Sequence, residues 1–299
     1  MKKFIKNNSL ILISITILVL WYLFSLSNFL VNFNASKENE YKYYENKCNL
    51  DNTISEKCDN LEKIKDYDVP PAPLLYSYII GASMDSIMYL PIITVLFVSI
   101  PAIYNFYRET KSGFYKNKLT REKYFNFFYG HYKKSLKCLL ILPIFLLITF
   151  FITCIISKFR FQDITFSNFF TTKEYAKSLW IPYFLTILFN ILYHSLFYIN
   201  TAYIAFYKAK NFAINIVLTY LFYLLSQIVI VRLIGMFFGR VLKMGEFAMS
   251  MEDPIIWGFG ADVPHFEYMI ISSILYAFIS TLIVFLFYRK KERFVISNE

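Results

Sequence analysis

The sequence predicts an all-α polytopic membrane protein with six transmembrane helices and with both termini in the cytoplasm. First, 57% of its 299 residues are hydrophobic and 17% are charged, whereas a soluble domain is about a quarter charged. Second, several apolar runs exceed the ~20 residues needed to cross ~30 Å of hydrocarbon. Third, Lys and Arg gather on one side of these runs, and basic loops remain in the cytoplasm.

The first helix is predicted at residues 9–31, which carry no charge and follow a short basic segment with Lys2, Lys3 and Lys6. A secretory signal peptide has a shorter apolar core, of ~7–15 residues. Residues 1–31 are therefore expected to form an N-terminal tail and a retained first transmembrane helix.

Residues 32–73 are predicted to form an extracytoplasmic lobe, because this stretch holds six basic and nine acidic side chains. Cys48 and Cys58 both lie in it. In an oxidising exterior a bridge between them would stabilise the lobe by roughly 2–3 kcal/mol; two free thiols are the alternative. No histidine stands beside them, so a zinc site is not expected there, and no other metal site is predicted.

Residues 74–299 are predicted to hold the other five transmembrane helices. Their expected positions are 86–107, 136–157, 178–207, 211–235 and 268–288, with residues 74–85 in or near the outer interface. In this arrangement the cytoplasmic segments carry 18 Lys and Arg in 57 positions, and the outer segments carry 12 in 94. Six helices therefore agree with the preference of basic loops for the cytoplasm.

The most basic segment is the predicted cytoplasmic loop 105–135, which follows the second helix. The stretch from Tyr104 to Lys137 holds nine Lys and Arg and two acids, a net charge of +7. Within it stand Arg108-Glu109, Gly113, Leu119-Thr120-Arg121 and Lys123-Tyr124, followed by Lys133, Lys134 and Lys137. With the six-helix topology, this pattern resembles the ABC-2 type permease family, the membrane subunits of ATP-binding-cassette exporters, particularly those of low-GC Gram-positive bacteria. The long first outer loop departs from many members.

The resemblance implies that the chain is a permease subunit in a bacterial cytoplasmic membrane and not itself an enzyme. It would move an amphipathic substrate (a peptide, an antimicrobial or a lipid-like molecule) outward, as a homodimer or with a related permease. A cytoplasmic ABC ATPase, which would hold the ATP and Mg, would dock on this loop. The residues expected to couple the two proteins are Arg108, Glu109, Gly113, Phe114, Arg121 and Tyr124. The alternative for the loop is that its basic residues only set topology and bind anionic lipid headgroups.

Two further regions have two interpretations each. The family often has short re-entrant helices where residues 236–267 stand here, and an aromatic anchor at the membrane interface is the alternative. Asn190, His194 and Asn200 share part of one helix face, and with Gln227 they are candidates for a translocation path. Interhelical hydrogen bonds, worth about 0.6–2 kcal/mol each, are the other explanation for these side chains.

Several functions are disfavoured by the sequence. It has no GxxxxGK[ST] phosphate loop, so the chain cannot itself be the ATPase. Its basic residues lie mainly at helix ends, as expected for membrane topology, so nucleic acid is not an expected partner and the bilayer is. The alternative function is a membrane immunity or sensor protein that does not transport and acts through residues 32–73. A membrane-embedded enzyme acting on lipids is a third possibility, supported only by the polar intramembrane residues.

Overall fold

The fold is all-helical in a computed structural model that describes residues 8–50, 69, 71–77, 79, 84–121, 123–161, 180–208, 211–249 and 266–289. The α-helices are α2 (Ser9–Leu50), α4 (Ala72–Ser77), α5 (Met84–Lys111), α6 (Phe114–Leu119), α7 (Tyr124–Ser135), α8 (Ile141–Ile156), α10 (Trp180–Lys208), α11 (Phe212–Gln227), α12 (Gly245–Met249) and α14 (Phe266–Tyr288). A 3-10 turn, η2 (Leu136–Leu140), joins α7 to α8, and two π-helical segments, η4 (Ile228–Ile234) and η5 (Phe237–Val241), follow α11.

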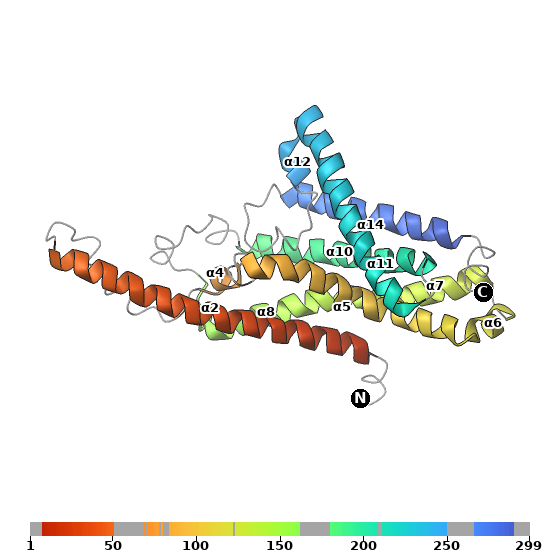
Figure 1. Ribbon diagram of the computed structural model, residues 1–299, viewed down its shortest axis with the longest axis horizontal. Helices are drawn as coiled ribbons and strands as arrows, with labels where there is room; N and C mark the ends of the chain where they lie inside the picture. Colours follow the sequence, from red (N-terminus) through yellow and green to blue (C-terminus); the bar gives the residue numbers. More distant parts are fainter. Residues whose placement is uncertain are drawn as a thin grey trace.

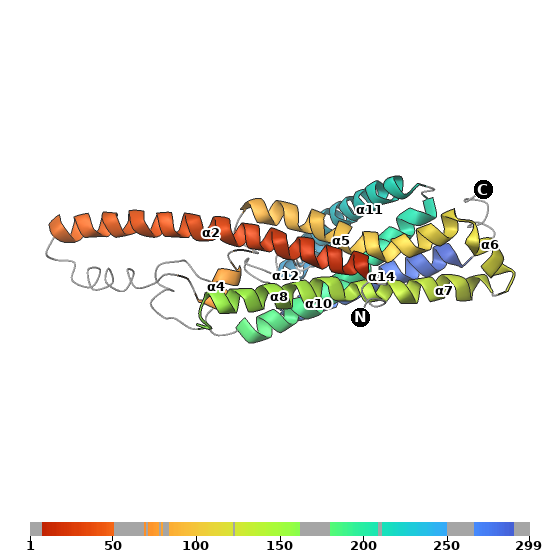
Figure 2. The ribbon, with the colours of Figure 1, turned by 90° about the horizontal axis from the view of Figure 1, so that it is seen from below.

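The helices form an elongated bundle in which α2, α5, α7–α8, α10 and α14 run roughly along the long axis (Figures 1 and 2). The helix α10 lies at the centre and packs against α14, α11, α5 and α8. More than half of its apolar stretch (56%) is buried, against 22% for α2, which lies at the periphery. The helix α11 leaves the end of the bundle near α6 and crosses the other helices obliquely (Figure 1).

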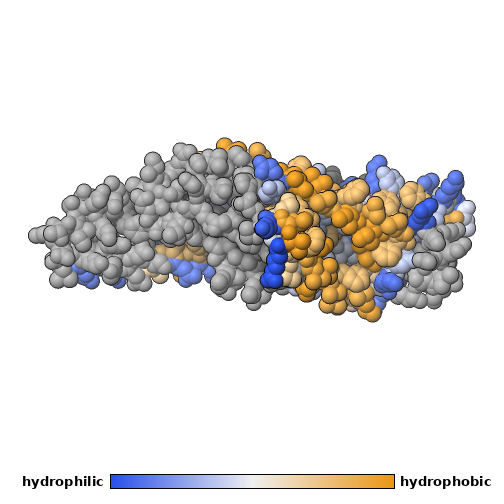
Figure 3. Space-filling view, turned by 90° about the horizontal axis from the view of Figure 1, so that it is seen from above, coloured by the Kyte–Doolittle hydropathy of each residue, from blue (hydrophilic) through white to orange (hydrophobic). Residues whose placement is uncertain are grey.

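Within the described ranges, four helices are long and apolar enough to cross a membrane: Ser9–Ala35, Tyr124–Ile156, Phe184–Lys208 and Glu267–Tyr288. Their outer faces carry large apolar side chains, such as Phe24 and Phe278, each 65% exposed. Figure 3 shows a band of hydrophobic residues with hydrophilic residues on both sides of it. A face of this kind suits lipid rather than water, so the chain is a multi-pass helical membrane protein.

The first helix extends well beyond the expected end of its membrane span. The apolar part ends near Ala35, close to the predicted residue 31, but α2 continues to Leu50. Residues 32–50 contain no Pro or Gly to stop a helix, and Glu38 and Lys42, one turn apart, form an ion pair of 2.8 Å. Hydropathy located the end of the apolar segment, whereas the helix itself extends into the predicted outer lobe.

The third predicted helix begins twelve residues earlier than expected, at Tyr124 instead of residue 136. The reason is that α7 is amphipathic: its buried residues are Tyr124, Phe127, Phe128, His131, Tyr132 and Ser135, which follow helical spacing. With η2 and α8 it makes one helical unit of 33 residues. At 1.5 Å per residue this is about 50 Å, longer than a membrane core. The predicted loop 105–135 is thus largely helical, and the connection from α5 to α7 is residues 112–123, which include α6.

The segment after α11 reverses direction. The chain continues from α11 directly into the π-helical segment η4. After η5 the chain turns at Lys243, which has a φ of 55°, and α12 packs back. A Cβ at Gly239 would lie 3.6 Å from that of Ala248. The predicted re-entrant segment 236–267 thus begins as a tight helical hairpin; residues 250–265 lie outside the described ranges, and re-entry into the membrane stays a prediction.

An aromatic cluster joins four helices near the end of the bundle that carries α6. The ring of Phe106 on α5 lies 5.1–6.4 Å from six other rings. We call these seven residues the Phe106 cluster: Phe106, Phe127, Phe128, His131, Tyr203, Phe206 and Tyr288. Within it, Phe128 on α7 stacks on Tyr288 of α14 at 4.3 Å with the planes 9° apart. This cluster holds α5, α7, α10 and α14 together.

We expect Phe128→Ala to lower the free energy of unfolding by about 3 kcal/mol, because a fully buried ring leaves a cavity. The matched control is Phe125→Ala on the same helix, where the ring is 51% exposed and the loss should stay below about 1 kcal/mol. Thermal unfolding of both variants in detergent measures the difference. Equal losses would contradict the role assigned to the Phe106 cluster.

Candidate functional site at the basic end

The end of the bundle that carries α6 gathers basic residues, and we call it the basic end. At its centre Glu109 of α5 accepts two hydrogen bonds on one oxygen, Oε2. Lys118 of α6 donates from Nζ at 2.7 Å, and His131 of α7 lies at 3.1 Å through Nε2. An ionised carboxylate can only accept, so Nε2 of His131 must carry the proton. This Glu109–Lys118–His131 triad fastens the connection to both helices that it joins.

The charge of Glu109 is stabilised by its neighbours. Its side chain is only 22% exposed, and burial opposes ionisation, but the hydrogen bond from Lys118 and the charges of His131, Lys118 and Lys134 outweigh it. The net effect is a pKa below the ordinary value of 4.5. Glu109 is therefore ionised at neutral pH. The ammonium of Lys118 also lies 5.7 Å from the centre of the Phe127 ring, where a cation is attracted to the aromatic face.

The connection between α5 and α7 is a compact turn. Gly113 has a φ of 69°, a left-handed conformation that side chains with a Cβ rarely adopt. The backbone N–H of Arg121 donates to the carbonyl of Lys118 at 2.9 Å and closes the end of α6. The side chains of Arg121 and Lys123 are exposed at the tip of this turn. The described part of the turn therefore presents Arg121 and Lys123 outward.

The predicted coupling residues fall into different environments. Arg108 is exposed, with its guanidinium 5.9 Å from the centre of the Tyr104 ring. Glu109 faces its own chain in the triad, Arg121 faces outward, and Tyr124 is buried, with 7% of its surface exposed. The side chain of Phe114 lies outside the described residues. The sequence analysis did not identify Lys118 and His131, because neither position has a local pattern that marks it as a partner of Glu109.

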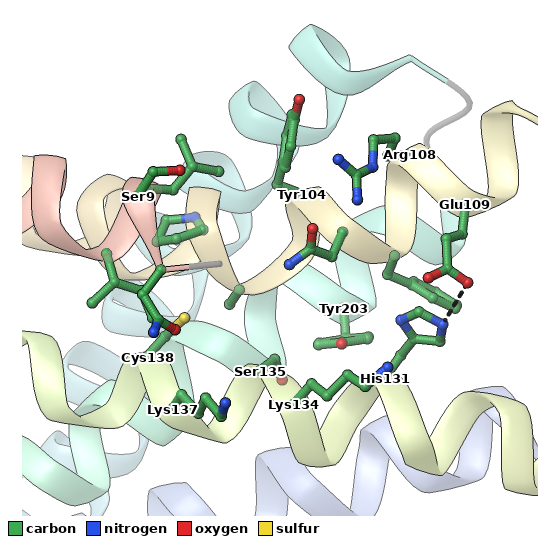
Figure 4. Close-up of a pocket in the computed structure, with 17 residues that line it drawn as sticks. Ser9, Tyr104, Arg108, Glu109, His131, Lys134, Ser135, Lys137, Cys138 and Tyr203 are labelled. Atoms are coloured by element: carbon green, nitrogen blue, oxygen red, sulfur yellow. Dashed lines mark hydrogen bonds and ion pairs between the residues drawn. The ribbon is translucent and has the colours of Figure 1, made fainter. Parts of the chain in front are cut away.

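A cleft of about 630 Å³ opens between the first turn of α2, the end of α5 and the α7–η2 segment (Figure 4). Its lining includes three cations, Arg108, Lys134 and Lys137, together with the ionised carboxylate of Glu109 and the imidazole of His131, whose pKa is lowered by burial. Figure 4 shows Arg108 on the α5 wall and the two lysines on the opposite wall, with Tyr203 between them. The lining of the cleft thus combines basic and polar side chains with apolar ones.

The polar residues predicted for a translocation path differ in their partners. Asn200 is fully paired: its Oδ1 accepts from Tyr132 at 2.7 Å, and its Nδ2 donates to Ser280 at 2.8 Å and Thr281 at 2.9 Å. These bonds join α10 to α7 and α14, so the interhelical explanation fits Asn200. The other three, Asn190, His194 and Gln227, do not line the cleft. A path through them stays a prediction.

Asn190 and His194 are both buried on α10, with 0% and 1% of their surfaces exposed. The amide of Asn190 has no hydrogen-bond partner among the described residues. His194 packs against the rings of Phe197, Tyr198 and Tyr276.

Cys58 lies outside the described ranges, so the Cys48–Cys58 bridge stays a prediction. Cys138 and Cys154 are buried free thiols on the α7–α8 unit. Within the part of the chain that the structure describes, no three His, Cys, Asp or Glu side chains are grouped so as to hold a metal ion.

These observations define a class: a multi-pass helical membrane protein with a basic end that carries a fastened turn and a polar cleft. No family model, no curated protein and no solved structure matches the chain. The resemblance to ABC-2 permeases therefore rests on the sequence pattern and the predicted topology.

We expect Glu109→Gln to lower stability at pH 7 by about 1 kcal/mol, because a partly exposed, charge-assisted hydrogen bond is lost. The pKa of Glu109 is lowered in the folded state, so its contribution is present above the unfolded value of 4.5 and is lost as the pH falls through the folded value. The difference between wild type and variant should shrink over this acid range. Unfolding midpoints measured from pH 7 to pH 3 test this.

The control for this experiment is Glu45→Gln, which changes an exposed acid on α2 and should leave stability at pH 7 within about 0.5 kcal/mol of wild type. If the difference between wild type and Glu109→Gln stays constant from pH 7 to pH 3, the carboxylate of Glu109 is not what stabilises the turn.

Proposed function

We propose that the chain is the membrane-spanning permease subunit of an ATP-binding-cassette exporter, with six spans, both termini in the cytoplasm and a separate ATPase. The observation that carries the proposal is the turn between α5 and α7. It is basic, it exposes Arg121 and Lys123 at its tip, and the Glu109–Lys118–His131 triad fastens it to two long helices. A turn of this construction suits the transfer of force from a soluble partner to helices.

The six-span topology adds α5 and α11 to the four apolar helices. The helix α5 has 28 residues, and α11, which is 16 residues long, continues through η4 to Ile234; each reaches the length that a span needs. Lys and Arg lie at one end of the bundle, in the segment Tyr104–Lys137 and at the ends of α10 and α14. Because basic segments prefer the cytoplasm, we propose that the basic end lies on the cytoplasmic side of a bacterial cytoplasmic membrane.

The proposed coupling step follows from how the turn is attached. A partner that pulls on Arg121 moves α6, which the salt bridge from Lys118 to Glu109 ties to α5. The same carboxylate binds His131 of α7, and α7 continues through η2 into α8 as one helical unit. A displacement at the turn is therefore passed to two transmembrane helices together. The exposed ring of Phe125, beside the turn, offers apolar contact area to the same partner.

The substrate is proposed to be amphipathic: a peptide, an antimicrobial or a lipid-like molecule. The aromatic-rich interior of the bundle supports this class. In the proposed assembly, two permease chains, either identical or related, bind two ATPases that hold ATP and Mg and move the substrate outward.

We expect Arg121→Glu to abolish co-purification of a nucleotide-binding protein with the chain from native membranes, because a charge reversal at the exposed tip opposes docking. Mass spectrometry of the purified complex measures this. The matched control is Lys133→Glu, which reverses an exposed charge on α7 outside the turn and the cleft and should retain the partner.

Unchanged unfolding midpoints for both variants would show that only docking is affected. If the wild-type chain purifies alone with background ATP hydrolysis, the permease proposal fails, and the alternative of a sensor or immunity protein acting through residues 32–73 takes its place.

A further inference from the structure

We propose that the cleft at the basic end binds a phosphate group, and that the headgroup of an anionic phospholipid supplies it. This inference does not depend on the exporter proposal. It rests on the charge of the cleft, on the backbone donors beside it and on its position in the bundle.

Among the described residues, the cleft holds more cations than acids. Arg108, Lys134 and Lys137 line it, and none of the three forms an ion pair with a carboxylate in the described part of the structure. Glu109 is the acid in the lining, and Lys118 and His131 already occupy its Oε2. Three cations on two walls of the cleft therefore surround one carboxylate that already has partners, and this excess of positive charge attracts an anion. Guanidinium and ammonium groups are the usual phosphate ligands.

Backbone donors stand beside these cations. The helix α2 begins at Ser9. The backbone N–H of Leu12 donates to the carbonyl of Asn8. The preceding N–H groups, those of Ser9, Leu10 and Ile11, have no partner within the helix, as at every helix start, and all three residues line the cleft. The positive end of a 42-residue helix thus adds to the field of the side chains.

The position of the cleft favours a lipid as the source. Ser9 and Lys137 lie where the predicted spans 9–31 and 136–157 begin, which is the level of lipid headgroups. The lining changes there from basic side chains to apolar ones such as Ile11 and Ala102. A headgroup in the cleft would place its phosphate among the cations and its acyl chains along the apolar faces of α2 and α8.

The test compares lipid binding by a variant that lacks two cations of the cleft with binding by a matched control variant. Lys134→Gln/Lys137→Gln takes both lysines from the cleft wall. Lys123→Gln/Lys133→Gln removes the same charge from exposed positions at the start and on the outer face of α7, neither of which lines the cleft. Native mass spectrometry of the full-length chain in detergent, titrated with phosphatidylglycerol, counts bound lipid, and parallel titrations use inorganic phosphate and ATP.

We expect the cleft variant to bind the first phosphatidylglycerol at least about tenfold more weakly than wild type, since each lysine near an anionic lipid contributes about a factor of five. The control variant should bind it within about twofold of wild type. Lys137→Gln alone should give an intermediate loss, which keeps the test usable if the double variant is unstable.

Other outcomes separate the possibilities. If inorganic phosphate or ATP binds at the cleft and displaces the lipid, the phosphate site stands and the lipid source is wrong. If both double variants lose lipid equally, the attraction is general surface charge and the site is overturned. Neither result bears on ATPase docking, which is measured at Arg121, so this inference and the exporter proposal can fail separately.

Discussion

The Phe106 cluster is the packing interaction on which the rest of the basic end depends. Lipid tails are as apolar as leucine, so transmembrane helices gain little from hydrophobic burial against one another and rely on close-fitting contacts. Phe106 supplies such contacts to α7, α10 and α14 at once. The ring of His131 lies 5.3 Å from it, and Glu109 follows three residues later on the same helix. The aromatic cluster therefore positions both the triad and one wall of the cleft.

Hydrogen bonds fix the register of the helices further along the bundle. Tyr22 of α2 bonds to Thr153 of α8, and Tyr76 of α4 bonds to Thr149 one turn away. Asn200 makes three bonds to α7 and α14, whereas the equally buried amide of Asn190 has no partner within the described residues. An unpaired buried amide is costly, so the level of Asn190 is where a rearranged helix or a polar ligand would recover free energy.

The sequence predicted the apolar spans well, because membrane insertion depends on the summed hydropathy of a segment. The four candidate spans all overlap predicted helices, and α14 agrees within two residues, Phe266 against residue 268. The start of α7 was not predicted, since Lys133 and Lys134 separate its buried aromatic side chains from the apolar run of α8 and lower the hydropathy there. The partners of Glu109 could not be predicted either: Lys118 and His131 lie nine and 22 positions away, and only the folded turn brings them together.

The structure also changes how a basic loop with a family pattern should be tested. In the sequence all nine cations of this stretch count equally toward topology. In the fold they separate: Lys118 compensates Glu109, Arg121 faces outward, and Lys134 and Lys137 line the cleft. A charge reversal at Glu109 would release Lys118 and His131 from their shared oxygen and loosen the turn whether or not a partner exists. A loss of function there would mix folding with docking. Arg121 is exposed, and its side chain forms no hydrogen bond or ion pair with the other described residues, so a charge reversal at that position disturbs the fold less.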